Sequence, residues 1–341
     1  MIIKEALLQE ELLLIEKFLL KFDLKLDKNL TKTFYIETEK GIIGTISCDN
    51  YIIKCLAVDP EFQSENLATV LINHIIDYFR INNIFNYQVF TKPIYKDVFE
   101  SLGFNEIVKT EKVIMLEGGV NFINDKINEI RNIIVHRFGN IDETSDIGCV
   151  VINGNPITNG HMHLIEEASI NHRMVILFVV EEDKSDFSFE ERFSFAYLST
   201  FRLGNVCVIP SSKYIVSQST FPSYFLKNEE DVINEYCIID ALIFEKYFVE
   251  KLHIKKRYVG QEFSNKMINY NNTLKNILLD KLVVIDRIKL DDEIISASKV
   301  RELLKSDQLE EALKYIPREI HILIKSYVVN NYGNAWKNFK R

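Results

Sequence analysis

The chain lacks the features that mark secreted, membrane and metal-binding proteins. None of its apolar runs approaches the roughly 20 residues of a bilayer-spanning helix, and the first residues have neither the basic stretch nor the cleavage site of a signal peptide. Its five cysteines include no CxxC pair, so neither a disulfide framework nor a zinc site is predicted. We expect a cytoplasmic protein without a membrane segment or a protein-held metal.

Charge and size narrow the class further. The net charge of −8 at pH 7 argues against general nucleic-acid binding, although a local basic cluster could still hold a polyanionic ligand. A length of 341 residues, 47% of them hydrophobic, suits two domains better than one. We place the domains at 1–118 and 147–341, joined by a helix and polar linker over 119–146.

The first domain reads as an α+β fold. Apolar residues at helical spacing predict helices over 7–22, 67–79 and 95–102, the last closed by Gly103. Runs rich in β-branched and aromatic residues, separated by turn residues, predict the strands. These strands are 33–38, 42–47, 51–58, 86–90, 104–109 and 112–117.

Two stretches of this domain, 56–68 and 99–104, resemble the GNAT acyltransferase family. In that family a loop after the central strand cradles the pyrophosphate of acetyl-CoA at a helix N-terminus. Gln63 and Ala68 match the loop pattern, whereas Asn66 stands where the family has its first glycine. The resemblance implies a GNAT-like fold. It leaves open whether the fold binds CoA or serves for packing or for docking a partner.

The second domain alternates strands with helices, which predicts a Rossmann-like parallel sheet with helices on both faces. The overall fold class is therefore α/β. Helices are expected over 161–170, 189–201, 235–251 and 265–279, with a helical tail from 298 to about 327. The expected strands are 148–152, 174–180, 205–209, 257–259 and 282–285.

A phosphate-binding signature follows the first strand of this sheet. Its helix N-terminus offers backbone N–H groups to an anion, and Gly160 lets a phosphate approach closely. Thr158 and His161 offer a hydroxyl and an imidazole to phosphate oxygens. Asn153 and Asn155, in the turn before them, are further candidates for ATP binding.

A second signature precedes the helical tail about 140 residues later. Ser298 is expected to cap the helix, with Arg301 three residues on along the same side. A guanidinium there could bind a pyrophosphate leaving group in bidentate fashion. Ser296 completes the candidate ATP-binding residues of this element. Together the two signatures describe a site for the triphosphate of a nucleotide.

Other polar residues fall at carboxyl ends of predicted strands, where open α/β sheets bind ligands. Lys184 could reach a phosphate, and Gly260 and Glu262 could contact a purine or ribose. A solvated loop and a turn that starts a helix explain them equally well. Arg192 either faces the site or serves the fold.

The paired signatures resemble the nucleotidylyltransferase superfamily. Four stretches together (153–161, 178–184, 219–226 and 258–262) are similar to the citrate lyase ligase family, which also places a GNAT-like domain before a nucleotidylyltransferase domain. This resemblance covers nearly the whole chain.

The resemblance implies an AMP-forming acid–thiol ligase that uses ATP and Mg²⁺. Acetate would attack ATP to give acetyl-adenylate, and the acetyl group would pass to the thiol prosthetic group of the citrate lyase acyl carrier subunit. The catalytic residues would be Thr158, His161 and Arg301. Three alternatives remain: an adenylyltransferase for a phosphorylated pantetheine-like or nicotinamide-nucleotide-like precursor, a GNAT N-acetyltransferase, and a non-catalytic nucleotide-binding scaffold.

Overall fold

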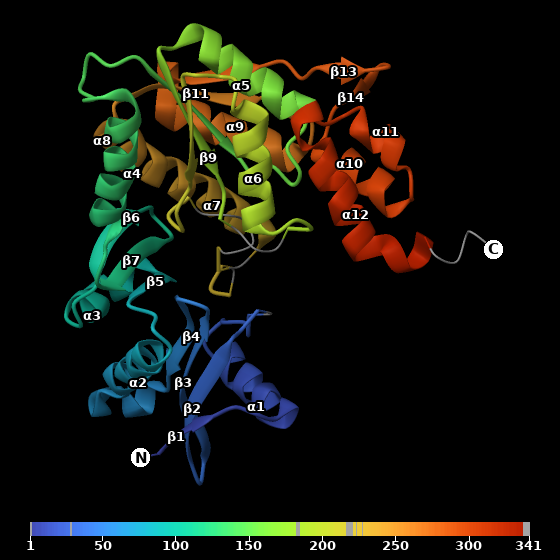
Figure 1. Cartoon of the computed structure of the whole chain (residues 1–341). Helices are drawn as coiled ribbons and strands as arrows, with labels where there is room; N and C mark the ends of the chain where they lie inside the picture. The colour runs from blue at the N-terminus through green and yellow to red at the C-terminus, as the bar shows by residue number, and fades with distance from the viewer. Residues whose placement is uncertain are drawn as a thin grey trace. The chain divides into compact units, whose positions relative to one another are not determined.

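The computed structural model describes residues 2–27, 29–181, 185–215, 221–222, 224–226 and 228–336, apart from the side chains of 63–65, 265–266 and 332–336 (Figure 1). The chain forms two compact units. Unit 1 comprises Met1–Lys126 and Val216–Ile243, and unit 2 comprises Ile127–Ile215 and Phe244–Arg341. Unit 1 thus includes a segment of the chain that lies far along the expected second domain.

Unit 1 is built on a sheet in the strand order β1-β2-β3-β4-β5-β7-β6. All neighbours pair antiparallel except β4 and β5, which run parallel. The α+β prediction is confirmed, and β1 is an addition too short for a sequence pattern to indicate. The strands are β1 (Ile3–Glu5), β2 (Lys32–Thr38), β3 (Gly41–Asp49), β4 (Ile52–Val58), β5 (Asn86–Thr91), β6 (Asn105–Lys109) and β7 (Ile114–Gly119).

Helix α2 (Leu67–Ile81) covers the core of unit 1 with a face that includes Leu71 and Ile75, both fully buried. Burial of such side chains contributes about 1.5–3 kcal/mol each. Asn66, just before α2, has a left-handed backbone (φ 54°), so the turn expected from the GNAT pattern persists without glycine. The other helical elements of unit 1 are α1 (Gln9–Leu20), η1 (Pro60–Glu65), η2 (Pro93–Tyr95), α3 (Lys96–Glu100) and α7 (Glu229–Ile243).

Residues 221–222 and 224–226 pack into unit 1 beside β5. The parallel pairing of β4 with β5 extends over only two residue pairs, Ile52 with Gln88 and Ile53 with Val89. The ring of Phe221 lies 5.4 Å from the ring of Phe90 on β5, and the Lys25 N–H donates to the Tyr224 carbonyl at 3.0 Å. These contacts explain why this part of the chain belongs to unit 1.

Unit 2 contains a parallel sheet in the order β10-β9-β8-β11-β12. The Rossmann-like prediction is confirmed. A hairpin of β13 (Lys289–Leu290) and β14 (Glu293–Ile294) was not expected from the sequence. The sheet strands are β8 (Ile147–Ile152), β9 (Met174–Val179), β10 (Val206–Pro210), β11 (Ile254–Gly260) and β12 (Leu282–Ile285).

The helices of unit 2 follow the strands, and one apolar core joins the sheet to α5, α6 and the helical tail. The helix expected over 235–251 is instead interrupted, because α7 ends at 243 and a π-helical turn follows. The expected helical tail is present and consists of several helices. The elements are α4 (Ile123–Phe138, which begins in unit 1), α5 (Asn159–Asn171), α6 (Phe189–Thr200), η3 (Phe244–Val249), α8 (Glu250–Leu252), α9 (Asn265–Leu278), η4 (Leu279–Lys281), α10 (Ala297–Lys305), α11 (Leu309–Leu313), η5 (Arg318–Ile320) and α12 (His321–Trp336).

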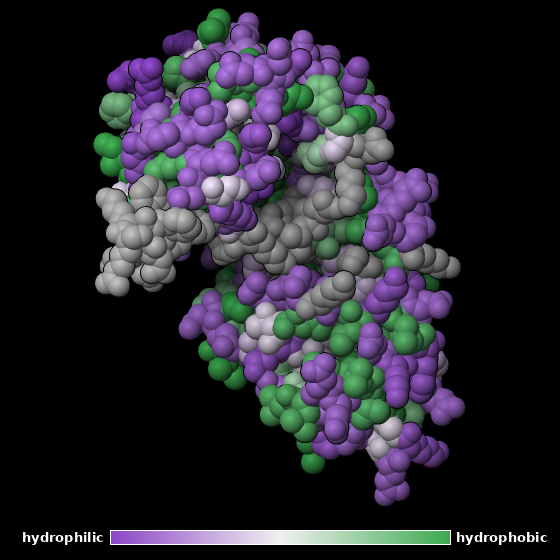
Figure 2. All heavy atoms as spheres, turned by 90° about the vertical axis from the view of Figure 1, so that its right-hand side faces the viewer, coloured by the Kyte–Doolittle hydropathy of each residue, from purple (hydrophilic) through white to green (hydrophobic). Residues whose placement is uncertain are grey.

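The surface mixes polar and apolar residues, as the face in Figure 2 shows. Exposed apolar side chains on α1 include Leu13, Leu14 and Leu20. Within the described ranges, no helix combines the length and the apolar character that crossing a membrane requires.

Candidate active site

The candidate site lies at the carboxyl ends of β8 and β11, which are neighbours in the sheet. From β8 the chain proceeds through β9 to β10 on one side, whereas from β11 it proceeds to β12 on the other. The strand order therefore reverses between β8 and β11. Open α/β sheets bind their ligands in the crevice outside the carboxyl ends of the strands at such a reversal. Residues 153–161 follow β8, and 260–262 end and follow β11.

Thr158 and His161 form the N-terminal cap of α5. Thr158 is the N-cap residue, and its Oγ1 accepts from the His161 N–H at 3.4 Å. In return, the imidazole Nδ1 accepts from the Thr158 N–H at 3.0 Å and lies 2.8 Å from Oγ1. The Asn155–Pro156 peptide bond just before is cis. The cap satisfies two N–H groups that a helix start would otherwise leave unpaired.

The imidazole of His161 is neutral and carries its proton on Nε2. A backbone N–H can only donate, so Nδ1 must accept and the remaining proton sits on Nε2. Burial of the ring, followed by the positive charge of Arg287, lowers the pKa of His161 to about 4. His161 therefore carries a neutral N–H donor at Nε2 near physiological pH.

The second signature starts α10, but Ser298 does not cap it. The N-cap is Ser296, whose backbone is extended (φ −141°, ψ 149°) and whose Oγ accepts from the Lys299 N–H at 3.2 Å. Ser298 already lies inside the first turn. Its Oγ instead accepts from Nη2 of Arg301 at 3.2 Å. The predicted placement of Ser298 and Arg301 on one side of the helix is confirmed.

The two signatures meet in the folded chain. Nη1 of Arg301 donates to the carbonyl of Asn155 at 2.5 Å, across 146 positions of sequence. A Cβ built on Gly160 would lie 3.4 Å from the carbonyl oxygen of Ile295, so the start of α5 adjoins the approach to α10. The Asn159 N–H donates to the carbonyl of Tyr315 at 2.9 Å, which adds the helical tail to the same junction.

Asn153 and Asn155 shape the loop after β8. Asn155 is buried (8% exposed), and its Oδ1 accepts from the Phe187 N–H at 3.1 Å. Asn153 is exposed, and its Oδ1 and carbonyl each accept from Nη1 of Arg192 at 2.8 Å. Arg192 is fully buried and also donates to the carbonyls of Val180 and Phe187. Arg192 thus links the ends of β8 and β9 through hydrogen bonds and stabilises the fold.

Gly260 and Glu262 lie at and just after the end of β11. The Gly260 carbonyl accepts from the Asn271 side chain at 3.0 Å, and a Cβ on Gly260 would meet no atom of the described residues within 4 Å. Glu262 forms an ion pair with Arg287, whose Nε also donates to the Gln261 carbonyl at 2.7 Å. Lys184 lies outside the described residues.

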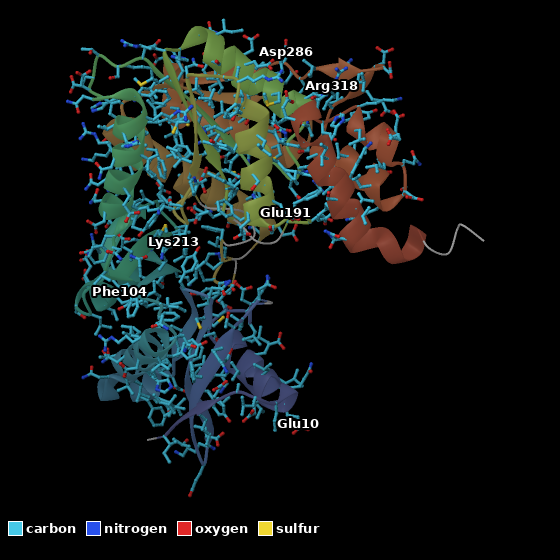
Figure 3. The ribbon with its side chains drawn as sticks, viewed as in Figure 1. Glu10, Phe104, Glu191, Lys213, Asp286 and Arg318 are labelled. Atoms are coloured by element: carbon cyan, nitrogen blue, oxygen red, sulfur yellow. The ribbon has the colours of Figure 1, made fainter. Side chains whose placement is uncertain are left out.

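Two charged residues of the site were not predicted from the sequence. Arg287 follows β12, and the rule that ligands meet carboxyl ends of strands could have indicated it. Asp186 pairs with Arg301 and Lys305. No sequence signal indicated an acidic residue beside the predicted phosphate site. Figure 3 marks Asp286, which precedes Arg287, and Glu191, which forms a capping box with Ser188 at the start of α6.

The fold and the paired signatures define a class: a chain in which a GNAT-like α+β unit is combined with a parallel α/β unit that carries both signatures at its reversal in strand order. Two family models match the chain. The citrate lyase ligase C-terminal domain matches residues 147–322, and the acetyltransferase (GNAT) domain matches residues 15–124.

Curated relatives match along most of the chain. The citrate (pro-3S)-lyase ligase of Escherichia coli K12 is 30% identical over 314 residues, which cover 89% of this chain and 87% of that protein. The citrate (pro-3S)-lyase ligase of Haemophilus influenzae Rd is 31% identical over 321 residues, which cover 91% and 93%. The chain belongs to the citrate lyase ligase family.

Proposed function

We propose that this protein acetylates the thiol prosthetic group of the citrate lyase acyl carrier subunit, using ATP and acetate. The single observation that carries the proposal is the bond from Arg301 to the Asn155 carbonyl, which joins both signatures at the reversal in strand order. The names of the relatives supply the substrate, because they act on citrate lyase.

The reaction needs no enzyme nucleophile. A carboxylate oxygen of acetate forms a bond to the α-phosphorus of ATP while the bond to the β-phosphate oxygen breaks and pyrophosphate leaves. The carrier thiol then attacks the acetyl carbonyl and releases AMP. Catalysis rests on positioning the reactants and on neutralising charge that builds on the phosphate oxygens.

Different residues of the chain perform the catalytic and the nucleotide-binding parts of the proposed reaction. His161 donates from Nε2 to a phosphate undergoing substitution, and Thr158 holds the ring through its N–H. Arg301 and Ser298 hold the β- and γ-phosphates, while Asn153, Gly160 and Ser296 shape the surrounding backbone. Gly260, Glu262 and Lys184 contribute to nucleotide binding. Removing one contact that forms only in the transition state costs about 2–4 kcal/mol, or roughly 10²–10³ in rate.

Mg²⁺ would reach the site with the nucleotide. Among the described residues, no three His, Cys, Asp or Glu side chains are grouped as a metal site. Mg²⁺ commonly keeps several waters and binds through substrate phosphates rather than a protein cage. The ion would neutralise charge on the triphosphate, and Ser298 and Arg301 would hold the same phosphates from the protein side.

The setting that the proposal requires is the cytoplasm, where ATP is available. All five cysteines are unpaired and buried, which agrees with a reducing compartment. The carrier subunit is the expected macromolecular partner, because its thiol arm must enter the site.

An ATP–pyrophosphate exchange assay tests the proposal. We expect labelled pyrophosphate to enter ATP only when acetate is present, and AMP release to require a thiol-bearing carrier as well. Acetate-independent formation of a dinucleotide from a phosphorylated pantetheine or nicotinamide precursor would instead support an adenylyltransferase. ATP binding without any turnover would support a scaffold.

A further inference from the structure

Three partners already hold the Arg301 guanidinium. Nε lies 3.1 Å from Oδ2 of Asp186, and the two terminal nitrogens donate to the Asn155 carbonyl and the Ser298 hydroxyl. A guanidinium carries five N–H donors in one plane. Two of these contacts are hydrogen bonds from the terminal nitrogens and the third is an ion pair at Nε, and together they set the orientation of that plane. With respect to the described residues, one N–H on each terminal nitrogen remains for a ligand.

Hydrogen bonds and a ring contact fix the backbone around Asp186. Its carbonyl accepts from the hydroxyl of Tyr327 at 2.9 Å. The next residue, Phe187, donates its N–H to Oδ1 of Asn155 and accepts from Nε of Arg192 at 3.2 Å. The Phe187 ring centre lies 4.2 Å from that of Tyr327. The carboxylate is therefore a fixed anchor for the long side chain of Arg301.

A second cation shares this anchor. Nζ of Lys305, one turn further along α10, lies 2.7 Å from Oδ1 of Asp186. The hydrogen bond from Lys305, with the charges of Lys305 and Arg301, lowers the pKa of Asp186. The carboxylate is thus ionised at neutral pH and joins the 185–188 loop to α10.

A carboxylate beside a phosphate-binding arginine repels the phosphates, so it must contribute something that offsets the repulsion. A free arginine side chain loses about 2 kcal/mol of rotamer entropy when a ligand immobilises it. Holding the side chain in place beforehand removes part of that cost. We propose that Asp186 is a positioning residue that fixes the Arg301 guanidinium with its two remaining N–H groups available to the triphosphate. This inference rests on the proposed function of the site.

A double-mutant cycle on the full chain tests it. Asp186→Asn keeps the shape and removes the charge, Arg301→Ala removes the positioned group, and Lys305→Ala is the control that leaves Arg301 paired. The Kd of ATP is measured by calorimetry, and kcat and KM by acetate-dependent exchange. We expect Asp186→Asn to raise Kd and KM about 10-fold, as for loss of a charge-assisted bond, with kcat changed less.

In the Arg301→Ala background the same substitution should change Kd less than about twofold, because the two residues act as one unit. Lys305→Ala should also have less than about a twofold effect. Equal effects of Asp186→Asn in both backgrounds, or tighter ATP binding by that variant, would overturn the inference. If Arg301→Ala weakens binding and Asp186→Asn does not, the inference alone fails. If wild type and Arg301→Ala bind ATP equally, the proposed function of the site fails as well. Thermal melts show whether each variant is folded.

Discussion

The main-chain N–H of Thr158 donates to the imidazole Nδ1 of His161 at 3.0 Å, within a helix cap. This one bond decides three properties of the histidine. It orients the ring, selects the tautomer with the proton on Nε2, and helps to keep the ring at the start of α5, where the second signature also arrives. The functional role of His161 can therefore be separated from its structural role by substitution.

His161→Asn should keep the cap and lose the catalysis. The asparagine Oδ1 can replace Nδ1 as the acceptor of the Thr158 N–H, but no group replaces Nε2–H. We expect folding stability within about 0.5 kcal/mol of wild type and acetate-dependent exchange reduced by about 10²–10³. His161→Ala should show the same loss of rate and, in addition, about 1 kcal/mol lower stability. Wild-type exchange in either variant would refute the role of His161.

The pH dependence of His161 gives a second prediction. A pKa of about 4 in the folded protein means that the ring stays neutral through physiological pH. Among the NMR signals of the seven histidines, those of the His161 ring should therefore stay nearly unchanged between pH 8 and pH 5. Signals that titrate near pH 6.5, assigned by their loss in His161→Asn, would contradict the structure.

The same pKa difference has a consequence for stability. An unfolded histidine titrates near 6.5, so between pH 6.5 and 4 the unfolded chain binds more protons than the folded one. The contribution of the neutral His161 ring to the free energy of unfolding is complete above pH 6.5. It decreases as the pH falls toward 4, by at most about 1.4 kcal/mol per pH unit. Denaturant unfolding measures how much the free energy of unfolding decreases between pH 7 and pH 5. This decrease should be about 2 kcal/mol smaller in His161→Asn than in wild type.

Serines 296 and 298 should respond differently to alanine. Ser296→Ala removes the cap of α10 and should cost about 1 kcal/mol of stability in thermal or denaturant unfolding. Ser298→Ala removes the acceptor for Nη2 of Arg301 and the proposed phosphate contact of Ser298 but no helix cap, so we expect stability within about 0.5 kcal/mol of wild type and a higher KM for ATP. A large loss of stability in Ser298→Ala together with none in Ser296→Ala would reverse the assignment of the cap.

Arg192 should matter for stability. Its guanidinium is buried and donates to three main-chain carbonyls, so Arg192→Leu would leave those groups without their donor. We expect a loss of about 3 kcal/mol or more in denaturant unfolding. The control is Arg202→Ala, whose side chain is 85% exposed and whose ion-pair distance to Glu319 is 3.9 Å. It should change stability by less than about 0.5 kcal/mol.

Local sequence patterns were sufficient for the larger elements and insufficient for the fine structure. Apolar spacing predicted α2, and runs of β-branched and aromatic residues between turn residues predicted the longer strands of both sheets, because period and composition are properties of short windows. The two- and three-residue strands β1, β13 and β14 carry no period and were missed. The cap of α10 was misplaced since Ser296 and Ser298 are chemically alike. Only the extended backbone at Ser296 distinguishes them.

The sequence by itself determined that a strand, a turn and a helix start would carry Thr158, Gly160 and His161, because those elements are set by neighbours along the chain. The tertiary structure decided what meets that helix start. Packing of α10 brought Arg301 to the Asn155 carbonyl, and the 185–188 loop brought Asp186 to Arg301. Such contacts join residues more than a hundred positions apart. They depend on how the elements pack around a common core, which no local pattern records.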